Sequence, residues 1–91
     1  MNTTVEVKIR KVFPVSETSR LRAVADALLN KEFVIHDIKI FEYENGTSVF
    51  MPSVKGGDGQ YHDIAHAVTS EARRDLIRLT LEAYKAKINQ N

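Results

Sequence analysis

Apolar and charged residues alternate strictly near the start of the chain. Val5, Val7 and Ile9 are separated by single charged residues, so that positions 5–10 read Val-Glu-Val-Lys-Ile-Arg. Successive side chains of a β-strand point to opposite faces, and this period of two therefore predicts a strand with one buried and one exposed face. A proline and two serines between positions 14 and 19 then mark a connection.

Residues 20–30 fit two patterns at once. Leu21, Val24, Ala25 and Leu28 have the spacing of one helical face, whereas the odd-numbered positions from 21 to 29 also alternate as in a strand. Alanine and leucine have high helix propensity. Taken by themselves, these residues favour a helix.

A β-hairpin is the clearest element of the sequence. Residues 33–43 contain seven large apolar or aromatic side chains, which predicts a strand buried at least partly on both faces. Asn45-Gly46 follows, a dipeptide typical of tight hairpin turns because both residues tolerate positive φ. Residues 48–51 are the predicted return strand, which ends at Pro52 because proline cannot donate to the ladder.

A glycine-rich loop and a long helix complete the predicted elements. Residues 53–59 hold three glycines and are expected to form a loop, with residues 61–68 irregular. Thr69 or Ser70 is expected to cap a helix over residues 71–88 through its side-chain oxygen. Apolar residues recur along one side of this helix, and lysines suit its C-terminal end. The predicted stripe consists of Ala72, Leu76, Leu79 and Ala83, flanked by Ile77, Thr80 and Tyr84.

Size and composition limit the possible classes. A chain of 91 residues forms one domain near the lower limit for a single apolar core, and a homodimer that extends this core is expected. Cysteine is absent, which excludes disulfides and thiolate metal sites. Lys and Arg number 13 against 12 Asp and Glu, so net charge does not by itself indicate a nucleic-acid partner. Neither a membrane-spanning apolar run nor a signal peptide is recognisable, which predicts a cytoplasmic protein with no membrane partner.

Three motifs resemble those of a known family. They are Glu-Phe-Val-Ile-His-Asp-Ile-Lys-Ile (32–40), Phe-Met-Pro-Ser (50–53) and Asp-Gly-Gln-Tyr-His-Asp-Ile-Ala-His (58–66). In this order, followed by a capped helix, they resemble the SpoVG family of small bacterial proteins named for stage V sporulation and septation. Residues 5–12 and 20–25 are also similar to the opening strands of that family, so the resemblance extends over nearly the whole chain.

The resemblance implies a fold and a function. The implied fold class is α+β: a small antiparallel β-sheet with a C-terminal α-helix packed on it, in a single domain over residues 1–91 that assembles as a dimer. Residues 20–29 would then form a strand, and we adopt this prediction because tertiary pairing often overrides propensity. Family members are DNA- and RNA-binding regulators, not enzymes. The implied partners are nucleic acid and a second copy of the chain, without a cofactor or small-molecule substrate.

The chain departs from the family pattern in the glycine-rich loop. The family carries a Lys-Arg pair after Met-Pro-Ser, where this chain has Val54-Lys55, so only Lys55 carries over as a basic residue linked to nucleic-acid binding. His62 stands at the position of a family arginine, and Ala67 at that of a family proline.

No catalytic or metal-binding motif is complete. His62-Asp63-Ile-Ala-His66 superficially resembles the zinc-binding His-Glu-x-x-His helix, but glycines precede it, the acid is Asp and the predicted helix begins later. His36 and Asp37 are neighbours in a predicted strand and should point to opposite faces, with His36 a satisfied core histidine or a dimer-interface group. The glycine loop lacks a Gly-Lys-Ser/Thr ending, and no serine has a nucleophile-elbow context. We predict no catalytic, metal or cofactor site.

Basic residues occur in three groups, for which we predict contacts with nucleic acid. The predicted residues are Lys8, Arg10 and Lys11 on the first strand, Lys55 and His62 around the glycine loop, and Arg73 and Arg74 on the helix. Tyr61, next to the loop, is the best-placed residue for stacking on a base. The simpler alternative for each group is an ordinary solvated surface.

The leading hypothesis is therefore a homodimeric, nucleic-acid-binding regulator. The alternative is a dimeric protein–protein interaction module with little nucleic-acid affinity, which the near-neutral charge and the Val54-Lys55 sequence favour. A small metal-dependent hydrolase ranks a distant third, because its metal motif fails on context.

Overall fold

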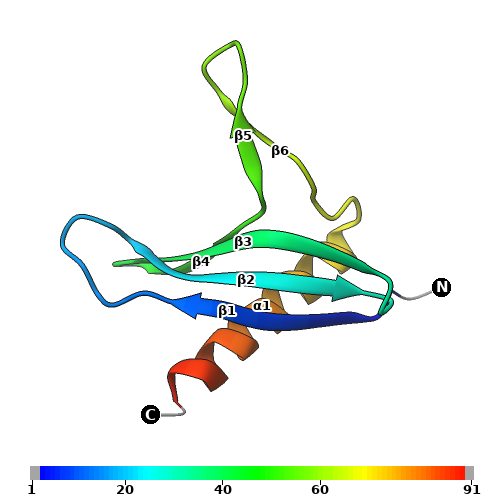
Figure 1. Cartoon of the computed structure of the whole chain (residues 1–91), viewed down its shortest axis with the longest axis horizontal. Helices are drawn as coiled ribbons and strands as arrows, with labels where there is room; N and C mark the ends of the chain where they lie inside the picture. Colours follow the sequence, from blue (N-terminus) through cyan, green and yellow to red (C-terminus); the bar gives the residue numbers. More distant parts are fainter. Residues whose placement is uncertain (1–2, 90–91) are drawn as a thin grey trace.

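The computed structural model describes residues 3–89 of the chain. A four-stranded antiparallel sheet carries one helix across it (Figure 1). The strands follow chain order, so neighbours in sequence are also neighbours in the sheet. Their bounds are Val5–Val12 for β1, Leu21–Leu29 for β2, Phe33–Tyr43 for β3 and Gly46–Phe50 for β4, and the helix α1 is Ser70–Ile88. The expected α+β class, with a C-terminal helix packed on an antiparallel sheet, is confirmed.

Local capping explains where α1 begins. Thr69 is extended, and its Oγ1 accepts a hydrogen bond from the backbone N–H of Ala72 at 3.1 Å. This satisfies one of the N–H groups that a helix N-terminus leaves without a partner, as predicted for Thr69. Lys85 and Lys87 occupy the last turn, where positive charge is favourable beside the helix dipole. Within residues 3–89, no helix is both long enough and apolar enough to cross a bilayer.

The core lies between α1 and one face of the sheet. The three fully buried apolar residues of β2 among those described are alanines, Ala23, Ala25 and Ala27, and Ile38 and Ile40 of β3 are the largest fully buried apolar side chains beside them. Within residues 3–89, the buried apolar residues of the core are Ile9, Ala23, Ala25, Ala27, Ile38, Ile40, Leu76 and Tyr84. Thr80 is also fully buried, so the helical stripe is centred on Leu76, Thr80 and Tyr84. Because three of the eight core residues are alanines, the core buries little apolar surface for a chain of this size.

Residues 21–29 form a strand, not a helix. β2 pairs with β1 on one side and with β3 on the other, so its backbone N–H and C=O groups find ladder partners in both directions. The strand implied by the family resemblance is confirmed, and the helix favoured by the residues alone is wrong. Hydrogen bonds to two distant segments outweigh the modest helix propensity of alanine and leucine.

The sheet has one covered face and one open face (Figure 1). The side chains of Ile38 and Ile40 are fully buried on the side of α1, whereas Val34 and Tyr43, on the other side of β3, remain 48% and 38% exposed. β3 was expected to be buried at least partly on both faces, but only the face toward α1 is covered; no element within residues 3–89 packs across the second face, where Phe41 is half-buried and Val34, Lys39 and Tyr43 are exposed. We call this second face the open face.

A separate two-stranded hairpin projects from the sheet (Figure 1). It consists of β5 (Ser53–Lys55) and β6 (Tyr61–Asp63), where a loop and an irregular segment were expected. The N–H of Gly56 donates to the carbonyl oxygen of Gln60 at 2.8 Å and closes the turn. We call residues 53–63 the arm. The glycine loop was thus correctly expected at residues 56–59, but the two short strands that flank it were missed because three-residue strands have no periodicity to detect.

Candidate nucleic-acid interface

The arm brings a lysine next to an aromatic side chain. Lys55 and Tyr61 are directly paired across its two strands, so both side chains lie on the same face of the hairpin. Tyr61 is 72% exposed, Lys55 is exposed as well, and Lys55 has no ion pair within residues 3–89. This combination of a cation and a flat ring is suited to a phosphate and an adjacent base.

His62 lies on the opposite face of the arm. It pairs with Val54, one residue along from Lys55, and its Nε2 lies 3.1 Å from Oδ2 of Asp58. The Asp58 carboxylate also accepts a hydrogen bond from the backbone N–H of Gln60 at 3.0 Å. The Gln60 N–H and, next, the His62 ring lower the pKa of Asp58. His62 is therefore held at the turn and not beside Lys55.

Two β-bulges at the same level of the sheet gather charged side chains around Asp26. The register of β1 shifts at Arg10, and that of β3 shifts at His36 and Asp37. Asp37 has a φ of 65°, a left-handed conformation that Asp tolerates better than most residues. Each bulge inserts an extra residue and re-aims the side chains next to it.

The side chains at these bulges form one ion-pair cluster. The Arg10 guanidinium contacts the Asp37 carboxylate and lies 3.5 Å from Oδ1 of Asp26, and the hydrogen bond to Asp37 raises the pKa of Arg10. His36 Nδ1 lies 3.2 Å from the same Asp26 oxygen, and its side chain is 62% exposed. The expectation of a core histidine is therefore wrong, and so is the simple alternation of His36 and Asp37, because the bulge breaks the period of two. The positive charge of Arg10 is therefore already paired with the carboxylates of Asp26 and Asp37.

Lys8 and Lys11 are the other predicted cations of β1. Lys8 pairs opposite Asp26, and the bulge shifts Lys11 so that it pairs opposite Val24. The Nζ of Lys11 lies 5.0 Å from the centroid of the Phe13 ring, a cation–π distance. Neither lysine has an ion pair within the described residues, so both are available to an anion.

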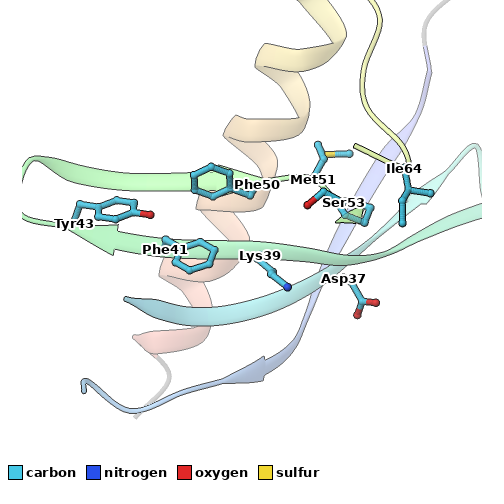
Figure 2. A pocket seen from close by; sticks show the side chains of 9 residues that line it. Asp37, Lys39, Phe41, Tyr43, Phe50, Met51, Ser53 and Ile64 are labelled. Atoms are coloured by element: carbon cyan, nitrogen blue, oxygen red, sulfur yellow. The ribbon is translucent and has the colours of Figure 1, made fainter. Parts of the chain in front are cut away.

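An aromatic cluster on the open face was not predicted. Phe41 and Tyr43 lie nearly parallel with ring centroids 6.2 Å apart, and Phe41 meets Phe50 edge-on at 5.2 Å. Figure 2 shows Phe41 between Tyr43 and Lys39 along β3, with Phe50 on the neighbouring strand β4. These four side chains line a shallow hollow of about 390 Å³, which the arm borders at its base. We call Phe41, Tyr43 and Phe50 the aromatic cluster.

A signal for this cluster was present in the sequence. Residues 39–43 read Lys-Ile-Phe-Glu-Tyr, so positions 39, 41 and 43 share one face and Ile40 the other. The cluster was missed because burial on both faces was expected, and an aromatic residue on a buried face is ordinary core. Only the absence of a covering element on the open face, among the residues that the structure describes, makes these rings notable.

The helix contributes two arginines that have no acidic partner among residues 3–89. Arg73 and Arg74 are exposed near the start of α1 and have no ion pair within the described part of the chain. Arg78, four residues after Arg74, lies 2.9 Å from Glu82 and 3.8 Å from Asp75. The helix therefore carries unpaired positive charge at both ends, from Arg73 and Arg74 in its first turns and from Lys85 and Lys87 in its last turn, among the residues that the structure describes.

One chain does not bring the predicted cations into a single patch. Lys8 and Lys11 lie on the open face, Lys55 lies on the arm, and Arg73 and Arg74 lie on the helix across the opposite face (Figure 1). Any ligand that contacts all three groups must therefore extend around the molecule or across more than one copy of it. The role of each residue in binding nucleic acid stays a prediction.

The His-Asp-Ile-Ala-His segment is not helical. His62 lies in β6, and His66 precedes α1 with its Nδ1 at 3.1 Å from the carbonyl oxygen of Ala67. Within residues 3–89, no group of three or more His, Asp or Glu side chains is arranged to hold a metal ion. The segment thus differs in geometry from a zinc-binding helix.

Comparison with known proteins gives the same family along most of the chain. The SpoVG family model matches residues 1–86. The septation protein SpoVG of Lachnospira eligens is 42% identical over 85 residues, which are 93% of this chain and 92% of that protein. The septation protein SpoVG of Agathobacter rectalis is 41% identical over 83 residues, 91% and 92% of the two chains. SpoVG 2 of Listeria monocytogenes is 39% identical over 80 residues, 88% of this chain and 76% of that protein.

Proposed function

Because the chain belongs to the SpoVG family, we propose that it is a nucleic-acid-binding regulatory protein that acts in the cytoplasm as a homodimer. Its relatives are named septation proteins, so control of septation is the process to which we assign it. The proposed activity is binding, and it involves no catalytic step. The observation that carries the proposal is the Lys55–Tyr61 pair on the projecting arm.

The arm has the features that a phosphate-contacting element needs. Lys55 supplies a positive charge without a competing carboxylate among the described residues, and Tyr61 supplies a ring on the same face. The turn between them contains three glycines, whose lack of side chains lets backbone N–H groups approach a phosphate closely. A lysine bound to a phosphate and a stacked ring are each independent of sequence, so we expect broad binding with little base specificity.

A homodimer would supply what one chain lacks. The core is small, and several large apolar side chains on the arm and after it are exposed: Val54 at 56%, Ile64 at 68% and Val68 at 89%. Burying these residues against a second copy would extend the core. Two copies would also double the number of cations available to one nucleic-acid strand, which compensates for the near-neutral charge of the chain.

A salt titration tests the proposal. Fluorescence anisotropy with mixed-sequence DNA and RNA oligonucleotides should detect binding at about 50 mM salt, with the logarithm of the binding constant falling linearly with the logarithm of salt concentration. Lys55→Gln should weaken binding to all sequences alike. It should also reduce the salt slope by about 0.7–0.9 for each phosphate that Lys55 neutralises in the wild-type complex.

The matched control is Lys31→Gln, which removes one positive charge from the turn between β2 and β3, outside the three cationic groups. It should change affinity and slope much less than Lys55→Gln. Absence of binding near 50 mM salt, or affinity that does not depend on salt, would rule out the proposed phosphate binding. Sedimentation equilibrium tests the dimer separately.

The exposed apolar residues favour a second candidate, a dimeric protein–protein interaction module with little nucleic-acid affinity. Ile64 and Val68 follow the arm in a segment that has no regular structure and no cover within the described chain. An affinity pull-down with the full chain distinguishes the two candidates. Recovery of nucleic acid without a stoichiometric protein partner supports the first candidate, and a stable protein partner with no nucleic acid supports the second.

A further inference from the structure

The open face of the sheet carries a second arrangement of rings and cations, distinct from the arm. Three aromatic side chains lie side by side at one end of this face, with Tyr43 38% exposed and Phe50 47% exposed. They are held by the strand register: Phe41 pairs opposite Ser48, and Phe50 pairs opposite Lys39. Since each ring is fixed on a β-strand, the cluster needs little ordering before it can accept a ligand.

Two lysines lie in a row of the open face that leads to the aromatic cluster. Reading across the sheet, Lys11 pairs opposite Val24, Val24 opposite Lys39, and Lys39 opposite Phe50. One row of the open face therefore contains two lysines and ends on a ring of the cluster. Neither lysine has an ion pair within residues 3–89.

Two carboxylates near this row, those of Asp37 and Glu42, either pair with Arg10 or lie on the other face of the sheet. Asp37 lines the hollow, but its carboxylate is bound by Arg10. Glu42, between Phe41 and Tyr43 in the chain, points to the other face, where it lies 3.5 Å from the Tyr84 hydroxyl. Because Arg10 balances only one of the two carboxylates that contact it, Asp26 and Asp37, an anion that reaches the two lysines meets one unbalanced negative charge from this cluster.

We propose that the open face, through the aromatic cluster together with Lys39 and Lys11, binds single-stranded nucleic acid by stacking unpaired bases on the rings and holding phosphates at the lysines. This inference rests on the proposed function and deepens it, because it selects the ligand class and adds a site that the arm does not include. Stacking requires an exposed base face, which a duplex does not offer along its length. The hollow of about 390 Å³ lies at the lower end of the range of ligand pockets and is open, as a site for a flat base must be.

A tryptophan reporter provides the most direct test, because the chain contains no tryptophan of its own. In Phe50→Trp the indole retains the ability to stack and introduces a single tryptophan at the cluster, whose emission can be excited selectively over that of the tyrosines. Titration of the full chain with a 12-nucleotide (dT) strand and a 12-nucleotide RNA should quench this fluorescence, whereas a 12-base-pair duplex should not.

The matched control is Phe33→Trp. Phe33 is also exposed on β3 but lies six residues before Lys39, roughly 20 Å along the strand. Its fluorescence should not respond to either strand. Equal quenching at the two positions, or quenching of Phe50→Trp by duplex as strongly as by single strands, would overturn the inference.

Affinity measurements on conservative variants provide the second test. Phe50→Leu retains an apolar side chain and should lower single-strand affinity about five- to a hundredfold, the range for loss of one stacked base. Lys39→Gln should lower the salt slope by about 0.7–0.9 while Lys31→Gln leaves it nearly unchanged. Circular dichroism melts of each variant establish that the fold is retained.

The outcomes separate this inference from the proposed function. If the wild-type chain binds no nucleic acid, both fail. If it binds but Phe50→Leu and Lys39→Gln bind single strands as the wild type does, the arm proposal stands and the open-face site is excluded. If instead Phe50→Leu converts a dimer into a monomer in sedimentation equilibrium, a second copy covers the open face and the single-strand site is overturned.

Discussion

The hydroxyl oxygen of Tyr84 lies 3.5 Å from Oε2 of Glu42, which joins the last turns of α1 to β3 across the sheet. The same carboxylate oxygen lies 3.8 Å from Nε of Arg22, whose side chain is only 8% exposed. The Nη1 of Arg22 donates to the carbonyl oxygen of Ser19 at 2.9 Å, but its Nε has no hydrogen-bond partner among the described residues. Glu42 is therefore the counter-charge of a nearly buried arginine and a contact of the helix at the same time.

Glu42→Gln should lower the free energy of unfolding by about 1–2 kcal/mol, because it leaves the buried Arg22 cation without its carboxylate. The effect is smaller than that of breaking a fully buried pair, since Glu42 itself is 51% exposed. Urea denaturation measures the change. Glu44→Gln, an equal charge change in the exposed turn two residues later, should stay within about 0.5 kcal/mol of wild type. Equal effects of the two substitutions would contradict the pairing with Arg22.

The pKa of Tyr84 predicts how stability depends on alkaline pH. Burial, followed by the nearby Glu42 carboxylate, raises the pKa of Tyr84 above its ordinary value. Below the ordinary tyrosine pKa of about 10 both states are protonated and the contribution to stability is complete. Between that value and the raised pKa, the folded state binds more protons than the unfolded state, so stability falls as pH rises.

Tyr84→Phe removes this titration. Its free energy of unfolding, measured in urea from pH 8 to pH 11, should fall less steeply than that of wild type once the pH exceeds the ordinary tyrosine pKa of about 10. Tyr43→Phe, on the open face, is the control and should retain the wild-type slope. A Tyr84→Phe profile parallel to wild type in this alkaline range would show that Tyr84 is not the titrating group.

The turn between β2 and β3 contains avoidable backbone strain. Asn30 and Lys31 both have positive φ, 52° and 59°, and the N–H of Glu32 closes the turn on the carbonyl oxygen of Leu29 at 3.0 Å. Asn tolerates this conformation, but Lys has no such preference. Lys31→Gly should therefore stabilise the fold by about 0.5–1 kcal/mol in thermal or urea unfolding. Lys31→Ala removes the same charge while retaining Cβ, and it should not stabilise; a gain as large as that of glycine would exclude the strain explanation.

Two neighbouring glycines of the arm should respond differently to an added methyl group. A Cβ at Gly56 would lie 3.0 Å from both Asp58 Oδ1 and His62 Cδ2, whereas a Cβ at Gly57 would meet nothing within 4 Å. Gly56→Ala should displace His62 from Asp58 and move the lowered pKa of Asp58 back towards its ordinary value, which a carboxyl-carbon NMR titration detects. Gly57→Ala should leave that pKa unchanged.

Neither glycine substitution should change global stability by more than about 0.5 kcal/mol, because no arm residue belongs to the core. A large loss of stability in Gly57→Ala would mean that the arm is packed against a further partner, such as a second copy of the chain.

Features that depend on neighbours in the chain could be predicted from the sequence. The alternation of β1, the hairpin at Asn45-Gly46 and the cap at Thr69 all involve residues within a few positions of one another. Even here the turn was predicted one residue too late: the two turn residues are Glu44 and Asn45, and Gly46, which has a positive φ, is the first residue of β4 and pairs with Tyr43. The candidate site was predicted less well: the predicted cations are exposed, but their contacts with nucleic acid stay a prediction, and Lys39 and the aromatic cluster were not named.

The remaining features depend on segments far apart in the chain, and only their packing decides them. β2 is a strand because β1 and β3 flank it, although its alanines favour a helix. The bulges at Arg10 and Asp37 bring side chains of β1 and β3 together beside Asp26 of β2, although these residues are far apart in the chain. Phe41 and Phe50 are surface rings because α1 covers only one face of the sheet. Periodicity along a chain assigns residues to faces, but it does not specify which face another element will cover.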